Sequence, residues 1–252
     1  MLAENREIQF LKQLPAMVQN VDFSKCFFHF QPIYNLKTMK VATYEALLRT
    51  RDTSVDSIES FVVSAISQGK ADELTQFTFD SMKPYLQCCK YEDVVFSINL
   101  EPLQLASRNF PRIATDFIKS NGIGVERLLL EITERPCSHK CFARLVKNVN
   151  YLSDHGFNFA IDDFGTGVSN FEMLTALNVG IVKLDGIFSR RAFSAPKNQQ
   201  ALNVAASLQE VFGCKVCVEG LETGDHIEMA KKLGFVFGQG FGLARPKLLD
   251  LD

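Results

Sequence analysis

The sequence lacks any apolar run long enough to cross a membrane, which argues against a transmembrane protein. A spanning helix needs about 20 predominantly apolar residues, and polar or charged residues interrupt every such stretch of the 252-residue chain. Residues 1–14, MLAENREIQFLKQL, carry charges where a signal peptide needs its apolar core. We therefore expect a cytoplasmic protein with no membrane insertion.

An excess of charge is also missing, and so is tryptophan. The net charge of −2 provides no broad basic surface for DNA or for an anionic membrane. A phosphate-bearing ligand would have to be held locally, by a metal or by a few cations. The chain has no low-complexity run, internal repeat or linker, so we expect a single main domain.

The seven cysteines do not form an even set, and reduced thiols are the expectation for a cytoplasmic chain. Cys214 and Cys217 have CxxC spacing, but in an apolar strand positions three apart face opposite sides. Cys137 and Cys141 flank His139, an arrangement compatible with zinc, yet no fourth ligand is evident. Structural thiols are the better interpretation of both pairs.

Strand-like and helix-like segments alternate along most of the chain, as in a parallel α/β sheet. Strands are predicted at 27–34, 41–48, 94–99, 128–132, 157–162, 179–184, 214–219 and 235–237. The first two form a hairpin around 35–37, so one strand of the sheet should be antiparallel. The number of strands in this length predicts an α/β fold of the (β/α)8 type, a modified TIM barrel. We assign residues 1–22 to an N-terminal helical extension and residues 23–252 to the barrel.

Apolar periodicity predicts the faces of several helices. Residues 2–18 have a helical apolar stripe, and Ser57–Leu86 reads as two helices broken near Gly69. The last long helix before residue 214 is expected to point Val204, Leu208, Val211 and Phe212 inward.

The stretch 159–167, FAIDDFGTG, combines an apolar strand with two adjacent acids and a glycine-containing loop. Asp162 and Asp163 at a buried strand end repel each other, so they should take up a proton or share a cation. An ordinary strand followed by an Asp/Gly turn is the alternative.

The same pattern recurs at other strand ends. Asn99, Glu131, Asp162, Lys183 and Glu219 each stand at or near the end of a predicted strand. In a (β/α)8 barrel these ends meet at one face, although helix caps could explain any one of them. A ring of carboxylate and amide oxygens suits Mg²⁺, Mn²⁺ or Ca²⁺ rather than zinc. Two reactions remain open: two-metal hydrolysis of a phosphate ester, and enolate chemistry with Lys183 as the base.

Seven motifs resemble, in order, those of the EAL-domain cyclic-di-GMP phosphodiesterase family. They are YEALLR with Glu45-Ala46-Leu47, SINL around Asn99, LEITE at 130–134, DDFGTG at 162–167, VKLD around Lys183, VEGLET at 218–223 and GQGFGLARP at 238–246. The resemblance runs from about Gln31 to Pro246. It implies a modified TIM barrel with one antiparallel strand and hydrolysis of c-di-GMP to linear pGpG.

The resemblance also implies a role for individual residues. Two Mg²⁺ or Mn²⁺ ions per site would be bound by Glu45, Asn99, Glu131, Asp162 and Asp163, with Asp162 bridging them. A water between the ions would attack phosphorus. The catalytic set would be Glu219 as a candidate base, Lys183 positioning the water, Gln239 bonding to the water network and Glu134 steadying the DDFGTG loop. Gln31 and Arg49 would contact the substrate.

The resemblance further places a homodimer contact near the DDFGTG loop. Departures from the family pattern at Thr50, Ile66, Val168 and Phe241 fall outside the implied metal ligands. Complete ligands favour an active phosphodiesterase. A catalytically weak c-di-GMP receptor and a protein-interaction module are the alternatives.

Overall fold

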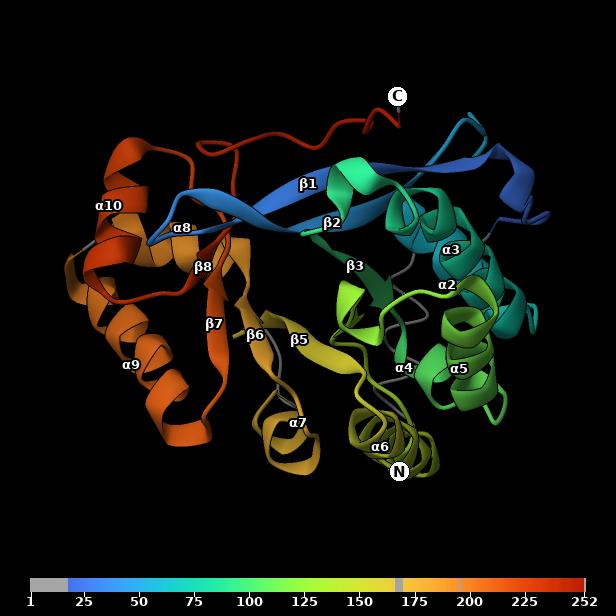
Figure 1. Ribbon diagram of the computed structural model, residues 1–252. Helices are drawn as coiled ribbons and strands as arrows, with labels where there is room; N and C mark the ends of the chain where they lie inside the picture. The colour runs from blue at the N-terminus through green and yellow to red at the C-terminus, as the bar shows by residue number, and fades with distance from the viewer. Residues whose placement is uncertain (1–17, 166–169, 195, 252) are drawn as a thin grey trace.

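Eight strands close into a barrel in chain order in the computed structural model, which describes residues 18–165, 170–194 and 196–251 (Figure 1). The strands are β1 Cys26–Asn35, β2 Lys40–Thr50, β3 Val95–Leu100, β4 Leu128–Ile132, β5 Asn158–Phe164, β6 Ile181–Leu184, β7 Lys215–Val218 and β8 Phe237–Gly238. All eight coincide with predicted strands to within a few residues. The α/β barrel prediction is therefore confirmed.

Helices connect the strands from β2 onward and cover the outside of the barrel (Figure 1). They are α2 Ile58–Ser67, α3 Ala71–Leu86, α4 Pro102–Leu105, α5 Phe110–Asn121, α6 His139–Asp154, α7 Asn170–Ala176, α8 Gly186–Ser194, α9 Pro196–Phe212 and α10 Gly224–Lys232. Single 3₁₀ turns lie at η1 Phe23–Lys25, η2 Cys89–Tyr91 and η3 Val125–Arg127. Among the described residues, no helix is both long and apolar enough to span a bilayer.

The predicted hairpin supplies the single antiparallel strand. β1 runs antiparallel to both of its neighbours, β2 and β8, whereas the neighbouring strands from β2 to β8 are parallel. The Asn35 side chain closes the turn by accepting hydrogen bonds from the backbone of Lys37 and Thr38. The register places Gln31 opposite Glu45. Both side chains therefore start from the same level of the barrel.

The helix break predicted near Gly69 is also present. Ser57 caps α2 by accepting from the backbone N–H of Ser60. Gly69 then takes a φ of 77°, a left-handed conformation that glycine adopts without steric cost. This turn lets α2 and α3 pack beside each other against the β1–β3 side of the barrel (Figure 1).

The predicted inward face of α9 is wrong in three of its four positions. Val204, Val211 and Phe212 are exposed, and only Leu208 is buried. Leu202 and Ala205 join Leu208 on the face that packs against the core. The sequence misleads because α9 carries apolar residues on two sides, so its periodicity does not say which side faces the barrel.

Aromatic side chains fill the space between the hairpin, β3 and α3. Phe30 and Phe96 are fully buried and meet edge to face with their ring centroids 5.7 Å apart. Tyr85 of α3 packs against Phe30, and Tyr44 stacks on Phe96. Much of the phenylalanine content thus serves the core.

Residues 18–21 join a second, smaller core beside α2. Val18 and Val21 pack with Phe61, Ala65 and Leu74. The predicted helix at 2–18 lies almost entirely outside the described residues.

The loops that follow β7 and β8 touch closely enough to require glycine. A Cβ atom built on Gly240 would overlap the backbone N, C and O atoms of Leu221. The Gln239 carbonyl also accepts a hydrogen bond from the Leu221 N–H at 3.1 Å. This contact fixes the end of β8 against the loop after β7.

We expect Gly240→Ala to lower the free energy of unfolding by about 1–3 kcal/mol, the usual cost of overpacking. The measurement is urea denaturation followed by circular dichroism. Gly224→Ala is the matched control because a Cβ there meets nothing within 4 Å. Equal stability of the two variants would contradict the close contact.

Candidate functional site

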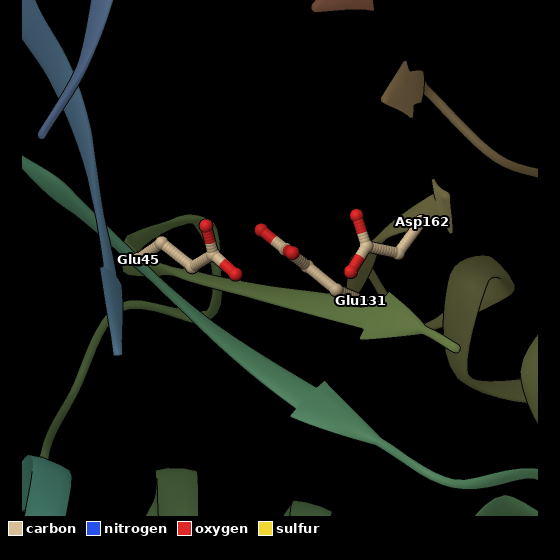
Figure 2. A group of neighbouring side chains, drawn as sticks. All are labelled: Glu45, Glu131 and Asp162. Carbon is tan, nitrogen blue, oxygen red and sulfur yellow. The ribbon is translucent and has the colours of Figure 1, made fainter. Parts of the chain in front are cut away.

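Carboxylates from separate strands converge at the carboxyl-terminal end of the barrel. Figure 2 shows the side chains of Glu45, Glu131 and Asp162 turned toward a common centre. One ligand oxygen from each lies within 4.8 Å of the others, and a second group joins Asp162 to Asp163 and Glu219 within the same limit. Asp162 belongs to both groups. The carboxylates therefore form two adjoining sites that share one residue.

The Lys183 ammonium lies among these carboxylates and is only 1% exposed. Its Nζ is 2.7 Å from Glu131 Oε2, 2.9 Å from Asp162 Oδ1, 2.9 Å from Glu219 Oε1 and 3.3 Å from Glu45 Oε2. Burial alone would lower the pKa of Lys183, but the surrounding carboxylates raise it well above its usual range. Lys183 is therefore a permanent cation that partly compensates four acids.

Two amide side chains fix the orientation of Glu45. Asn99 Nδ2 donates to Glu45 Oε1 at 2.9 Å, and Gln239 Nε2 donates to Glu45 Oε2 at 2.7 Å. Burial opposes ionisation, but Lys183 and these hydrogen bonds together lower the pKa of Glu45. Glu45 is thus held as a carboxylate.

A bulge near the end of β5 separates the two adjacent aspartates. The pairing of β5 with β6 shifts between Ile161 and Phe164, and Asp163 has a φ of 54°. Such a left-handed conformation is costly for aspartate and is concentrated at functional sites. It leaves Asp162 buried in the barrel while Asp163 reaches solvent on the same side of the cluster.

The remaining acids are hard to ionise without additional positive charge. Burial, followed by the charges of Glu45 and Asp162, raises the pKa of Glu131 to about 8 despite the opposing effect of Lys183. Burial also raises the pKa of Asp162, and that of Glu219 well above its usual range. Burial and then the charge of Asp162 raise the pKa of Asp163 to about 6, although its side chain still reaches solvent. One lysine does not neutralise this set.

Two of the buried oxygen atoms at the cluster have no hydrogen-bond partner among the described residues. They are Glu131 Oε1 and Asn99 Oδ1. A buried acceptor without a donor costs free energy, and both atoms are of the type that bind Mg²⁺ or Mn²⁺. With the raised carboxylate pKa values, these atoms make the residues a good fit for hard divalent cations.

The other predicted site residues lie around the cluster rather than within it. Gln31 is buried, and its Nε2 donates to the Ala244 carbonyl at 3.2 Å. Arg49 donates to the Leu48 carbonyl at 2.8 Å and lines a neighbouring pocket. Glu134 is half-buried in the segment that follows β4. None of the three belongs to either carboxylate group.

The sequence analysis did not identify a series of ion-paired side chains beside the cluster. Arg135 Nε lies 2.7 Å from Glu101 Oε2, and Arg135 Nη1 lies 3.3 Å from Glu59 Oε1. These residues line a pocket of about 250 Å³ that also includes Arg49 and Asn99. Their positions in the sequence could have indicated these residues, because Glu101 follows the predicted ligand Asn99 by two residues and Arg135 follows Glu131 by four.

Both cysteine pairs singled out in the sequence lie within the described part of the chain. No disulfide joins any of the seven cysteines, all of which are among the described residues. Within residues 18–165, 170–194 and 196–251, the two carboxylate groups are the metal-compatible clusters, and Cys137, His139 and Cys141 do not form one. Cys141 Sγ instead lies 3.8 Å from the Pro102 carbonyl as a hydrogen-bond donor.

One curated relative of the chain is named as a probable cyclic di-GMP phosphodiesterase. The chain is 30% identical over 228 residues to the "Probable cyclic di-GMP phosphodiesterase PdeB" of Escherichia coli (strain K12), covering 87% of this chain and 42% of PdeB. The chain spans less than half the length of the curated relatives it matches.

Solved structures share the fold. The structure of the EAL enzyme Bd1971 bound to cAMP and cyclic-di-GMP matches with a TM-score of 0.81 at 23% identity, covering 99% of this chain and 66% of that one. The PaMucR phosphodiesterase in complex with c-di-GMP matches with a TM-score of 0.77 at 25% identity, covering 88% and 97%.

Comparison with protein families matches residues 14–246 to the EAL domain. This match covers most of the chain, including every strand of the barrel and both carboxylate groups. The chain belongs to the EAL domain family.

Proposed function

We propose that the protein hydrolyses c-di-GMP to linear pGpG with two divalent cations, Mg²⁺ or Mn²⁺. The observation that carries this proposal is the pair of carboxylate groups sharing Asp162. Two-metal sites of this kind are typical of phosphoester hydrolysis. The names of the relatives and the c-di-GMP complex of PaMucR support the choice of substrate.

Glu45, Asn99, Glu131, Asp162 and Asp163 would hold the ions. The metals would supply Lewis acidity to a water and charge neutralisation to the phosphodiester. Enolate chemistry would instead require Lys183 as a neutral base. Its pKa is raised by the surrounding carboxylates although burial opposes this, so it remains an ammonium.

Two side chains of the protein would stabilise the transition-state charge and accept the proton of the attacking water. The Lys183 ammonium would orient the attacking water and offset negative charge in the transition state. Glu219 would accept the proton of that water, since its pKa is raised by burial and it borders the Asp162–Asp163 group. As the new P–O bond forms, the bond to the ribose 3′ oxygen breaks, and that oxygen leaves as a hydroxyl by taking a proton from solvent, while Glu219 returns the proton of the attacking water to solvent.

Residues around the cluster would position the substrate. Gln31 and Arg49 would contact the nucleotide, with Arg49 offering donors beyond the one used on Leu48. Gln239 would keep Glu45 oriented and bond to the water network. Glu134 would steady the loop 162–167, of which residues 166 and 167 lie outside the described part of the chain.

We place the reaction in the cytoplasm. Seven cysteines without a disulfide among them support this placement, because reduced cysteines are the rule in the cytoplasm.

The defining experiment incubates the purified protein with c-di-GMP and Mg²⁺ or Mn²⁺ and follows pGpG by chromatography. We expect Asp162→Ala to reduce kcat by at least about 100-fold, the scale seen when a group that stabilises transition-state charge is removed. The variant should fold, because Lys183 keeps Glu45, Glu131 and Glu219 as partners.

Asp116→Ala, on an exposed face of α5, is the matched control and should be fully active. Near-normal activity of Asp162→Ala would refute the shared-ligand arrangement. Tight c-di-GMP binding without product would identify a receptor instead, and the absence of binding would favour a protein-interaction module.

Metal binding should be pH-dependent. Because burial and neighbouring charges raise the pKa of Glu131 to about 8 and that of Asp163 to about 6, cations must displace protons at lower pH. We expect Mn²⁺ affinity to rise between pH 6 and pH 8, by at most about tenfold per pH unit for each proton displaced. Calorimetry in buffers of different ionisation enthalpy measures the protons released. A constant affinity with no proton release would contradict the raised pKa values.

We further propose a homodimer through the region of the DDFGTG loop. Residues 166–169 lie outside the described part of the chain, but α7 follows directly and exposes Phe171 to 58%. The Phe171 ring meets Phe164 edge to face at 5.4 Å, next to the paired aspartates. A contact at Phe171 would thus adjoin the carboxylate cluster.

Phe171→Asp should convert the dimer to a monomer in size-exclusion chromatography with light scattering, because a charge there would be desolvated at the interface. Leu103→Asp, which changes a similarly exposed apolar residue on α4, is the control and should remain dimeric. A Phe171→Asp protein that stays dimeric would exclude this face.

A further inference from the structure

Arg135 connects three segments that follow neighbouring barrel strands. Its own segment follows β4, Glu101 follows β3, and Glu59 begins the helix α2 that follows β2. The guanidinium reaches Glu101 Oε2 at 2.7 Å and Glu59 Oε1 at 3.3 Å. One planar group with several donors can make both contacts at once, which a lysine ammonium on a flexible stem does less well.

The two carboxylates that Arg135 holds differ in their surroundings. The Glu101 side chain is 10% exposed and the Glu59 side chain 53% exposed. Glu101 also takes part in the capping box of α4, where its backbone N–H bonds to the Gln104 side chain. Burial raises the pKa of Glu101, and Arg135 opposes that shift. The inner contact therefore secures a buried acid, while the outer contact holds a solvent-accessible one in place.

Both contacts border the side pocket of about 250 Å³. Its walls include Arg49 at the end of β2 and Asn99 at the end of β3, so the pocket adjoins the carboxylate cluster. Ile58 and Val62 of α2 add apolar surface beside Glu59. The outer contact of Arg135 thus holds the first turn of α2, which forms one wall of the pocket, in addition to the core packing of Phe61 and Ala65.

We propose that Arg135 is a positioning residue for substrate affinity: by holding Glu59 and α2 against the side pocket, it keeps that wall in the shape that receives part of the cyclic dinucleotide. This inference rests on the proposed function. Arg135 touches neither carboxylate group and does not act on the reacting atoms.

The metal-binding residues should not depend on Arg135. Strand pairing fixes the backbone at Glu45, Asn99 and Glu131. Asn99 and Gln239 donate hydrogen bonds to Glu45, and Lys183 donates to Glu131. Losing the outer contact should loosen the first turn of α2 at Glu59 while leaving this network intact. The expected signature is a raised KM with an unchanged kcat and an unchanged affinity for Mn²⁺.

Arg135→Lys and Glu59→Gln test this signature while keeping a positive charge beside the buried Glu101. Lysine preserves the charge beside Glu101, and Glu59→Gln changes only the half-exposed carboxylate. Each variant should raise KM for c-di-GMP about two- to fivefold, the effect of losing one partly exposed ion pair. The double variant should be no worse than either single variant, since both remove the same contact. Arg112→Gln, which breaks an exposed pair on α5, is the matched control.

An unchanged KM in both variants would overturn the inference. So would a parallel loss of kcat, Mn²⁺ affinity and melting temperature, which would indicate a merely structural role. Should the wild-type protein bind c-di-GMP without hydrolysing it, the same comparison is made on Kd, and a rise of about two- to fivefold would support the inference although the proposed activity had failed. A wild-type protein that neither binds nor hydrolyses c-di-GMP would refute both.

Discussion

The placement of one ammonium group among four carboxylates is the constraint on which the site depends. Like charges this close and this poorly hydrated repel strongly, because the low polarity of the interior does not screen them. Lys183 contacts all four acids, and Asn99 and Gln239 donate to one of them. The barrel can thus assemble around its acids, yet burial raises the pKa values of Glu131, Asp162 and Glu219, so these three ionise more readily when further cations bind.

The closed barrel makes this concentration of charge possible. Glu45 and Gln239 are 194 positions apart in the chain but are hydrogen-bonded inside the barrel. Parallel strands end at the same level, so each contributes one or two side chains without any loop having to fold inward. The loops then serve a different purpose: Gly240 against Leu221, and Arg135 between Glu101 and Glu59, fix the rim around a rigid centre.

The sequence predicted what depends on local pattern and on the general geometry of barrels. The strands, the Asn35 turn, the Gly69 break and the meeting of Glu131, Asp162 and Glu219 around Lys183 follow from periodicity and from the rule that parallel strand ends share one face. The family resemblance, and not periodicity, added Glu45 to this set. The outward face of α9 did not follow, because Val204 and Val211 are as apolar as Leu202 and Leu208. Nor did the left-handed Asp163 or the reach of Arg135, since both depend on how separate segments meet in space.

The reversed direction of β1 also determines how the polypeptide enters the barrel. Cys26, the first residue of β1, pairs with Thr50, the last residue of β2, so β1 starts at the rim where the carboxylates lie. In an all-parallel barrel the first strand would start at the opposite, closed base. Residues 18–25 therefore approach from the reaction side and dock beside α2, the same helix that lines the side pocket. A displacement of residues 18–25 would therefore act directly on α2 and the side pocket, without passing through the barrel strands.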